Sequence, residues 1–188
     1  MRLIIEVEDI LLETELMAMS VLIVYSSTHG TTEKAAMLIR DQVKNEEETV
    51  LINIKQNSVP DLDLFDKVII GASIHMGAIP RKMRNFLYKE EPALMSKTLG
   101  LFLCCLYEDI EAQLQFERSF PETLREHAVA HGFFGGELLF EEMNIFEKMI
   151  AKKVSGSIEN VHSMNYEAID QFITMVSETK KNDPEKMR

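Results

Sequence analysis

Apolar runs of strand length alternate with amphipathic runs of helix length along most of this 188-residue chain. Such an alternation is typical of a parallel sheet that is covered by helices on both faces. The pattern predicts strands at 20–25, 49–54, 67–72, 98–106 and 132–140, and helices at 33–44, 80–89, 111–131, 142–154 and 166–180. The sequence therefore predicts an α/β fold, a three-layer α/β/α sandwich around a five-stranded parallel sheet.

The balance of charge and the use of cysteine narrow the class of protein. A net charge of −11 argues against nucleic acid as a partner, because basic patches supply most of the affinity for phosphate backbones. An acidic surface favours steering toward a basic partner instead. The two cysteines, Cys104 and Cys105, are adjacent and have no other thiol to pair with, which fits a reducing, cytoplasmic location. No apolar segment reaches the roughly 18 to 20 residues that a spanning helix needs, so we expect at most peripheral membrane contact.

The two ends of the chain differ in composition from its centre. Residues 1–18 mix apolar residues with five acids and a single arginine, whereas a signal peptide has a basic start and an uninterrupted apolar core. We expect this segment to be an extension outside the domain, since Met19 is a natural start. The domain is then expected at 19–181, followed by a polar tail at 182–188.

The segment between the first predicted strand and the first predicted helix is rich in hydroxyl groups. The backbone N–H groups at a helix N-terminus have no partner within the helix and carry a partial positive charge, so a phosphate group fits there. The residues that we predict for such a site are Ser26, Ser27, Thr28, Gly30, Thr31 and Thr32. The alternative is a helix cap, since Ser and Thr are favoured at that position in any case.

The same segment resembles a known family signature. Residues 27–33, Ser-Thr-His-Gly-Thr-Thr-Glu, are similar to the phosphate loop of flavodoxins, S/T-x-x-G-x-T-E, and the resemblance extends over about 19–178. It implies a flavodoxin-like fold with strand order 2-1-3-4-5 and bound FMN, whose phosphate the loop would hold. Flavodoxin is also the standard example of that strand order, with FMN at the switch point between the first and third strands.

The resemblance implies two further contacts with the flavin ring. The loop after the third strand would contact one edge and face of the ring through Ser73, Ile74, His75, Met76 and Gly77. The loop after the fourth strand would cover the other face through Cys105, Leu106 and Tyr107, with Tyr107 as the stacking residue. The alternatives are an ordinary strand-to-helix turn for the first loop and buried, unreactive thiols for the cysteines.

Several stretches are similar to one subgroup, the menaquinone-dependent protoporphyrinogen IX dehydrogenases. These stretches are 68–77, 133–138, 146–150 and 155–156. The resemblance implies an oxidoreductase of heme biosynthesis, in which FMN takes electrons from protoporphyrinogen IX and passes them to a quinone. It also implies an added helix, here at 142–154, which would either touch a quinone or membrane surface or pack on the sheet.

Two other functions remain open, and no catalytic residue can be assigned. The chain could be a non-enzymatic electron carrier that docks to a redox partner protein through its acidic surface, or a binding module without FMN. The histidines His127, His131 and His162 lack metal-ligand spacing, and the aspartates at 61, 63 and 66 lack the pattern of a calcium loop, so we expect no metal.

Overall fold

The computed structural model describes residues 20–27, 30–43, 48–74, 77–105, 107, 109–138, 161–162 and 164–178. Five strands form one parallel sheet, in the order β2-β1-β3-β4-β5. They are β1 (Ser20–Ser26), β2 (Glu48–Asn53), β3 (Lys67–Ser73), β4 (Thr98–Cys104) and β5 (Ala130–Phe133). Every neighbouring pair is parallel, so the predicted sheet and its order 2-1-3-4-5 are confirmed.

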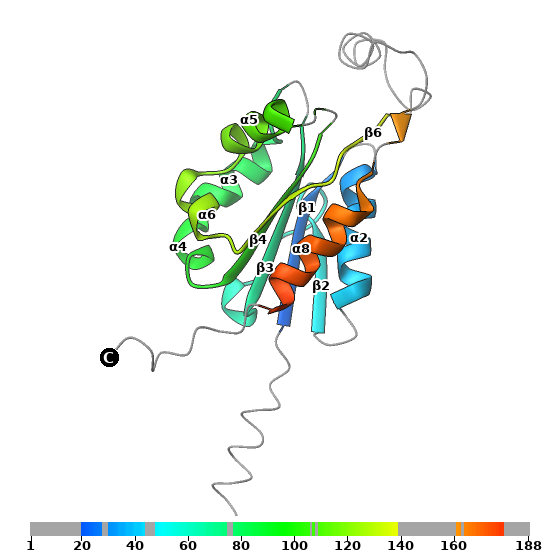
Figure 1. Ribbon diagram of the computed structural model, residues 1–188. Helices are drawn as coiled ribbons and strands as arrows, with labels where there is room; N and C mark the ends of the chain where they lie inside the picture. The colour runs from blue at the N-terminus through cyan, green and yellow to red at the C-terminus, as the bar shows by residue number, and fades with distance from the viewer. Residues whose placement is uncertain are drawn as a thin grey trace, which may run out of the picture.

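Helices cover both faces of this sheet, as Figure 1 shows. One face carries α2 (Thr31–Val43) and α8 (Tyr166–Glu178). The other carries α3 (Arg81–Lys89), α4 (Glu91–Leu94), α5 (Asp109–Ser119) and α6 (Glu122–His127). The short α4 was not predicted, and the run predicted as one interrupted helix at 111–131 is two helices, α5 and α6, with Pro121 at the N-cap of α6.

The core lies in two layers, because successive strand residues point to opposite faces. In β1, Leu22 and Val24 face the α3–α6 layer, whereas Val21 and Ile23 face α2 and α8. All four are fully buried, which is what a continuous apolar run in a central parallel strand predicts.

Phenylalanine rings pack over two glycines in the second layer. The sheet register places Phe102 of β4 between Gly71 of β3 and Gly132 of β5. A methyl group added at Gly71 would overlap the Phe102 ring. The ring also stacks on Phe134 at 4.8 Å and meets Phe172 of α8 edge-on at 6.1 Å between centroids. The absence of a side chain at Gly71 and Gly132 therefore leaves room for the rings of Phe102 and Phe134.

The strand predicted at 132–140 is wrong in its extent. The parallel strand β5 ends at Phe133, and Gly135 then takes a φ of +72°, which turns the chain. The next pairing is antiparallel, between β6 (Glu137–Leu138) and β7 (Val161–His162). After β7, Asn165 N donates to Phe134 O at 3.0 Å, which ties the returning chain to the end of β5. The helix predicted at 142–154 lies outside the described residues, as do the segments 1–18 and 182–188.

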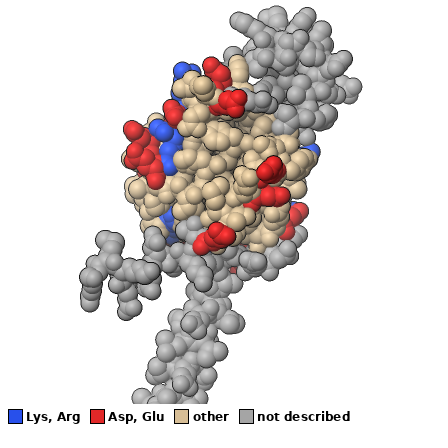
Figure 2. Space-filling model, in the orientation of Figure 1, with Lys and Arg blue, Asp and Glu red and all other residues tan. Residues whose placement is uncertain are grey.

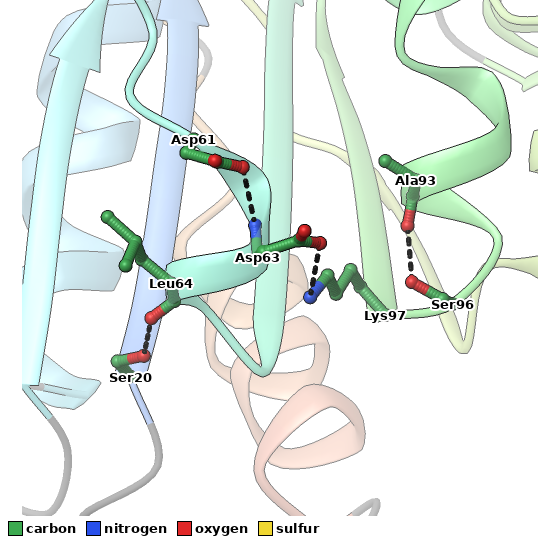
Figure 3. Close-up of polar contacts among 7 residues, drawn as sticks. All are labelled: Ser20, Asp61, Asp63, Leu64, Ala93, Ser96 and Lys97. Carbon is green, nitrogen blue, oxygen red and sulfur yellow. Dashed lines mark hydrogen bonds and ion pairs between the residues drawn. The ribbon is translucent and has the colours of Figure 1, made fainter.

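Short polar contacts close the amino end of the sheet (Figure 3). A 3-10 turn, η1 (Leu62–Leu64), is capped by Asp61, whose side chain accepts a hydrogen bond from Asp63 N at 3.0 Å. Asp63 lies 3.9 Å from the ammonium group of Lys97, and Ser20 Oγ donates to Leu64 O at 2.7 Å. Asp61 and Asp63 therefore contact groups of their own chain.

The described residues hold neither a cluster of metal ligands nor a membrane-spanning helix. Among them, no three or more His, Cys, Asp or Glu side chains lie together as metal ligands would. No helix in the same ranges is both long and apolar enough to cross a membrane.

Candidate functional site

The connection from β1 to α2 is a tight turn at the carboxyl edge of the sheet. Its geometry is set by Ser27, whose Oγ accepts a hydrogen bond from Gly30 N at 3.0 Å. Gly30 has a φ of +86°, a conformation that favours glycine. Its carbonyl accepts from Lys34 N at 2.8 Å, which starts the hydrogen bonding of α2. The helix begins at Thr31, two residues before the predicted start, so Thr31 and Thr32 lie in its first turn.

Two hydroxyl groups in this turn are buried without a partner. Within the described ranges, Ser26 Oγ and Thr32 Oγ1 form no hydrogen bond, and both residues are 0% exposed. A buried polar group without a partner costs about 1–3 kcal/mol, so such groups mark places where a ligand supplies the missing bond. They lie beside the N-terminus of α2, where the partial charge is positive. Hydroxyl groups without a partner can donate to an anionic group with several acceptor oxygens, such as a phosphate.

Tyr25, which the sequence reasoning missed, supports the first turn of α2. Its hydroxyl donates to Glu33 Oε1 at 2.7 Å, and the side chain is 4% exposed. Burial, followed by the hydrogen bond and the negative charge of Glu33, raises the pKa of Tyr25 to about 12. The contact joins Tyr25 of β1 to Glu33 in the first turn of α2. The sequence did contain a signal for this role, because Tyr25 is a polar aromatic residue that directly follows the apolar run of β1.

The ends of three strands meet beside this turn. The register pairs Ser26 of β1 with Ala72 of β3, and Ser73 of β3 with Cys104 of β4. The hydroxyl of Ser73 donates to Ser26 O at 3.2 Å, which ties the second predicted loop to the first. On the other side, Ile74 N donates to Cys104 O at 3.4 Å. The three predicted loops therefore start from adjacent positions on one edge.

The loop after β4 places a thiol and an aromatic ring near this edge. Cys105 is buried, its Sγ–H donates to Tyr107 O at 3.5 Å, and burial raises the pKa of the thiol. Tyr107 is 38% exposed, so part of its ring is open to solvent. Asp109, at the start of α5, has a φ of +49°, an unusual backbone conformation for a residue other than glycine.

The structure describes some of the predicted site residues and not others. Ser26, Ser27, Thr31 and Thr32 are buried, whereas Gly30 is exposed. Gly77 is exposed too, with a φ of +79° and open space where a side chain would be. The remaining predicted residues, Thr28, His75, Met76 and Leu106, lie outside the described residues. Whether any of them contacts a flavin stays a prediction.

A comparison with protein families gives one match. The profile described as the flavodoxin domain covers residues 22–165, more than half of the chain. No curated protein sequence matches this one significantly. The family match gives no separate support to the protoporphyrinogen dehydrogenases, so that narrower reading stays a prediction.

Solved structures share the fold at low identity. Oxidised flavodoxin 2 from Bacillus cereus is 24% identical, with 85% of this chain and 98% of that chain covered and a TM-score of 0.53. The apo form of the NADH:FMN oxidoreductase EMOB is 14% identical, with 90% and 100% covered and a TM-score of 0.55. The chain also spans 41% of a longer protein, the metal-soaked Flv1 flavodiiron core from Synechocystis sp. PCC6803, at 16% identity, 95% coverage of this chain and a TM-score of 0.49.

Proposed function

The chain belongs to the flavodoxin domain family, and from this premise we propose that it binds FMN at the carboxyl edge of its sheet and carries electrons on it. The observation that carries the proposal is the pair of buried hydroxyls, Ser26 and Thr32, that have no partner among the described residues. They lie where the family signature expects the FMN phosphate. Bound FMN would supply the redox chemistry, because it accepts and releases one or two electrons.

The residues of the first turn would hold the phosphate without a cation from the loop. Ser26 and Thr32 would each donate a hydroxyl hydrogen bond, which is stronger to a charged oxygen than to a neutral one. The N-terminus of α2 adds its free N–H groups. Tyr25 and Glu33 would keep the first turn of α2 in place against β1.

The residues at the ends of β3 and β4 would hold the ring. Ser73 is fixed through its bond to Ser26 O, so the position of the second loop depends on that of the first. Tyr107 is the proposed stacking residue, since its ring is partly exposed at the same edge. Cys105 is buried with a raised thiol pKa, which favours the neutral thiol as a packing group.

A titration of the apoprotein with FMN and with riboflavin tests the proposal. Binding to the protein should quench the fluorescence of both flavins. FMN should bind far more tightly than riboflavin, because riboflavin lacks the phosphate. Equal affinity for the two flavins would rule out the phosphate turn as the main anchor. Absence of any binding after reconstitution would overturn the proposal and leave a binding module of the same fold.

A second candidate, protoporphyrinogen IX dehydrogenase, keeps the support of the resemblance at 68–77 and 133–138. Anaerobic mixing of the FMN-loaded protein with protoporphyrinogen IX separates the two functions. Bleaching of the flavin bands by the porphyrinogen, with reoxidation by a menaquinone analogue, would favour the dehydrogenase. Bleaching only by a flavodoxin reductase would favour the carrier.

A further inference from the structure

Helix α3 carries a concentrated positive charge on an acidic protein. Its exposed cations are Arg81, Lys82, Arg84 and Lys89, and the helix contains no acid. The chain as a whole has a net charge of −11, so the four charges of α3 leave −15 on the rest. Figure 2 shows Lys and Arg atoms next to Asp and Glu atoms on the left of the molecule, the side on which Figure 1 places α3 to α6. We call these four side chains the basic face of α3.

Among the described residues, one of these four cations, Lys89, is paired with an acid. No ion pair joins Arg81 or Arg84 to an acidic side chain in the same ranges. Lys82 Nζ donates to a neutral group, Asn57 O, at 3.4 Å. Lys89 pairs with its neighbour Glu90 at 2.7 Å, but its side chain is 82% exposed, and a pair so open to water contributes little. The cations are therefore available to a partner.

A groove lined by both apolar and polar residues runs along the same helix. It has a volume of about 510 Å³ and lies between α3 and the connection from β2 to η1. Lys82 and Lys89 border it together with the carboxylates of Asp61 and Glu90, so the charges of the groove balance. The apolar side chains in its wall are those of Ile54, Val59, Pro60, Leu62 and Phe86. The groove can therefore take an apolar side chain, while carboxylates of the same occupant would meet the arginines of α3, which do not line it.

We propose that the basic face of α3 and this groove together bind an acidic segment of a partner protein, with an apolar side chain of that segment in the groove. Charge complementarity favours a short acidic segment, because such a segment would contact α3 and not the acidic remainder of the surface. A long polyanion such as DNA would also meet the −15 of the remaining surface and be repelled. The inference stands on charges and shape, and it does not depend on whether the chain binds FMN.

The placement of this surface adds a consequence for an electron carrier. A carrier meets a donor and an acceptor in turn, and faces of opposite charge would direct the two to different sides. The helix begins at Arg81, four residues after Gly77 of the loop at the proposed flavin edge. A partner on the N-terminal half of α3 would thus dock beside that edge.

Fluorescence anisotropy with a labelled peptide of alternating glutamate and leucine tests the surface. The full chain should bind this peptide at low salt and lose it as salt is raised. Arg84→Glu should weaken binding by about threefold to tenfold, the range for one exposed charge pair replaced by a repulsion. The matched control is Arg118→Glu on α5, which makes the same change in net charge at another exposed helical position and should leave binding unchanged.

Two further peptides separate charge from shape. A peptide with glutamine in place of glutamate should lose binding, and one with serine in place of leucine should bind more weakly. An equal loss in Arg84→Glu and Arg118→Glu would overturn the proposal, because net charge alone would explain it. Tighter binding of a DNA duplex than of the peptide would also overturn it. So would peptide binding that appears only after deletion of residues 1–18, since the surface would then serve the acidic N-terminal segment of this chain.

Discussion

Replacing Thr32 by valine should have opposite effects on the stability of the apoprotein and on its affinity for FMN. The substitution keeps the branched shape and removes only the hydroxyl, which is buried without a partner among the described residues. In the apoprotein this hydroxyl is an unsatisfied polar group. Removing the hydroxyl should therefore stabilise the apoprotein, since the native residue favours binding at the expense of stability.

The expected size follows from the burial of Thr32. At 0% exposure the hydroxyl carries the full desolvation penalty, so Thr32→Val should raise the free energy of unfolding by about 1–3 kcal/mol. For a chain of this length, each kcal/mol moves the melting temperature by roughly 2–4 °C, so Tm should rise by about 2–12 °C. Loss of a hydrogen bond to a charged phosphate should weaken FMN binding by about 10- to 150-fold.

Thermal unfolding by circular dichroism and titration with FMN measure the two effects. Riboflavin affinity should stay unchanged in Thr32→Val, because riboflavin has no phosphate. The matched control is Thr174→Val in α8, where Oγ1 donates to Asp170 O at 3.0 Å, so this helical threonine has no orphan hydroxyl to relieve. A lower Tm for Thr32→Val together with unchanged FMN affinity would refute the reasoning, because it would mean that the hydroxyl is already satisfied.

Three other outcomes are expected from the packing and the titrating groups. Gly71→Ala should lower the free energy of unfolding by about 1–3 kcal/mol in a urea titration, because its methyl group overlaps the Phe102 ring, and adding Phe102→Leu should recover part of that loss. In an alkaline spectroscopic titration Tyr25 should ionise last, near pH 12. Since its folded pKa is raised, its contribution to stability is complete below about pH 10 and is lost as the pH rises toward 12. Tyr25→Phe should remove that last titration step. Cys105 should react with a thiol reagent more slowly in the folded protein than in urea, because burial both shields the thiol and raises its pKa.

The sheet could be predicted because each of its central strands is a short apolar run between turn residues. The run at 67–72 needed no tertiary information, and β3 extends it by one residue only. The extent of β5 could not be predicted in the same way. The strand ends shortly before Gly135, which has a positive φ. The sequence alone does not show which conformation a glycine in an apolar stretch adopts.

The candidate site was predictable as a location but not in its detail. A run of hydroxyls after the first strand identified the loop, yet Ser26 and Ser27 look alike in the sequence. The turn geometry gives them different roles, because Ser27 Oγ accepts from Gly30 N, whereas Ser26 Oγ has no partner in the described ranges. The contact between Tyr25 and Glu33 likewise needs the distance between strand and helix, which only the fold supplies.

The antiparallel pair β6–β7 brings together two positions that are distant in the sequence. Leu138 of β6 and Val161 of β7 face each other in this pair, although 22 residues separate them in the sequence. Facing residues of an antiparallel pair can be joined by a two-residue Asn-Gly turn, so the two strands define a point at which the chain can be cut and rejoined. The parallel sheet, the buried hydroxyls and the basic helix are all built from other stretches of sequence. A sequence inserted between Leu138 and Val161 would therefore leave all of those stretches intact in the chain.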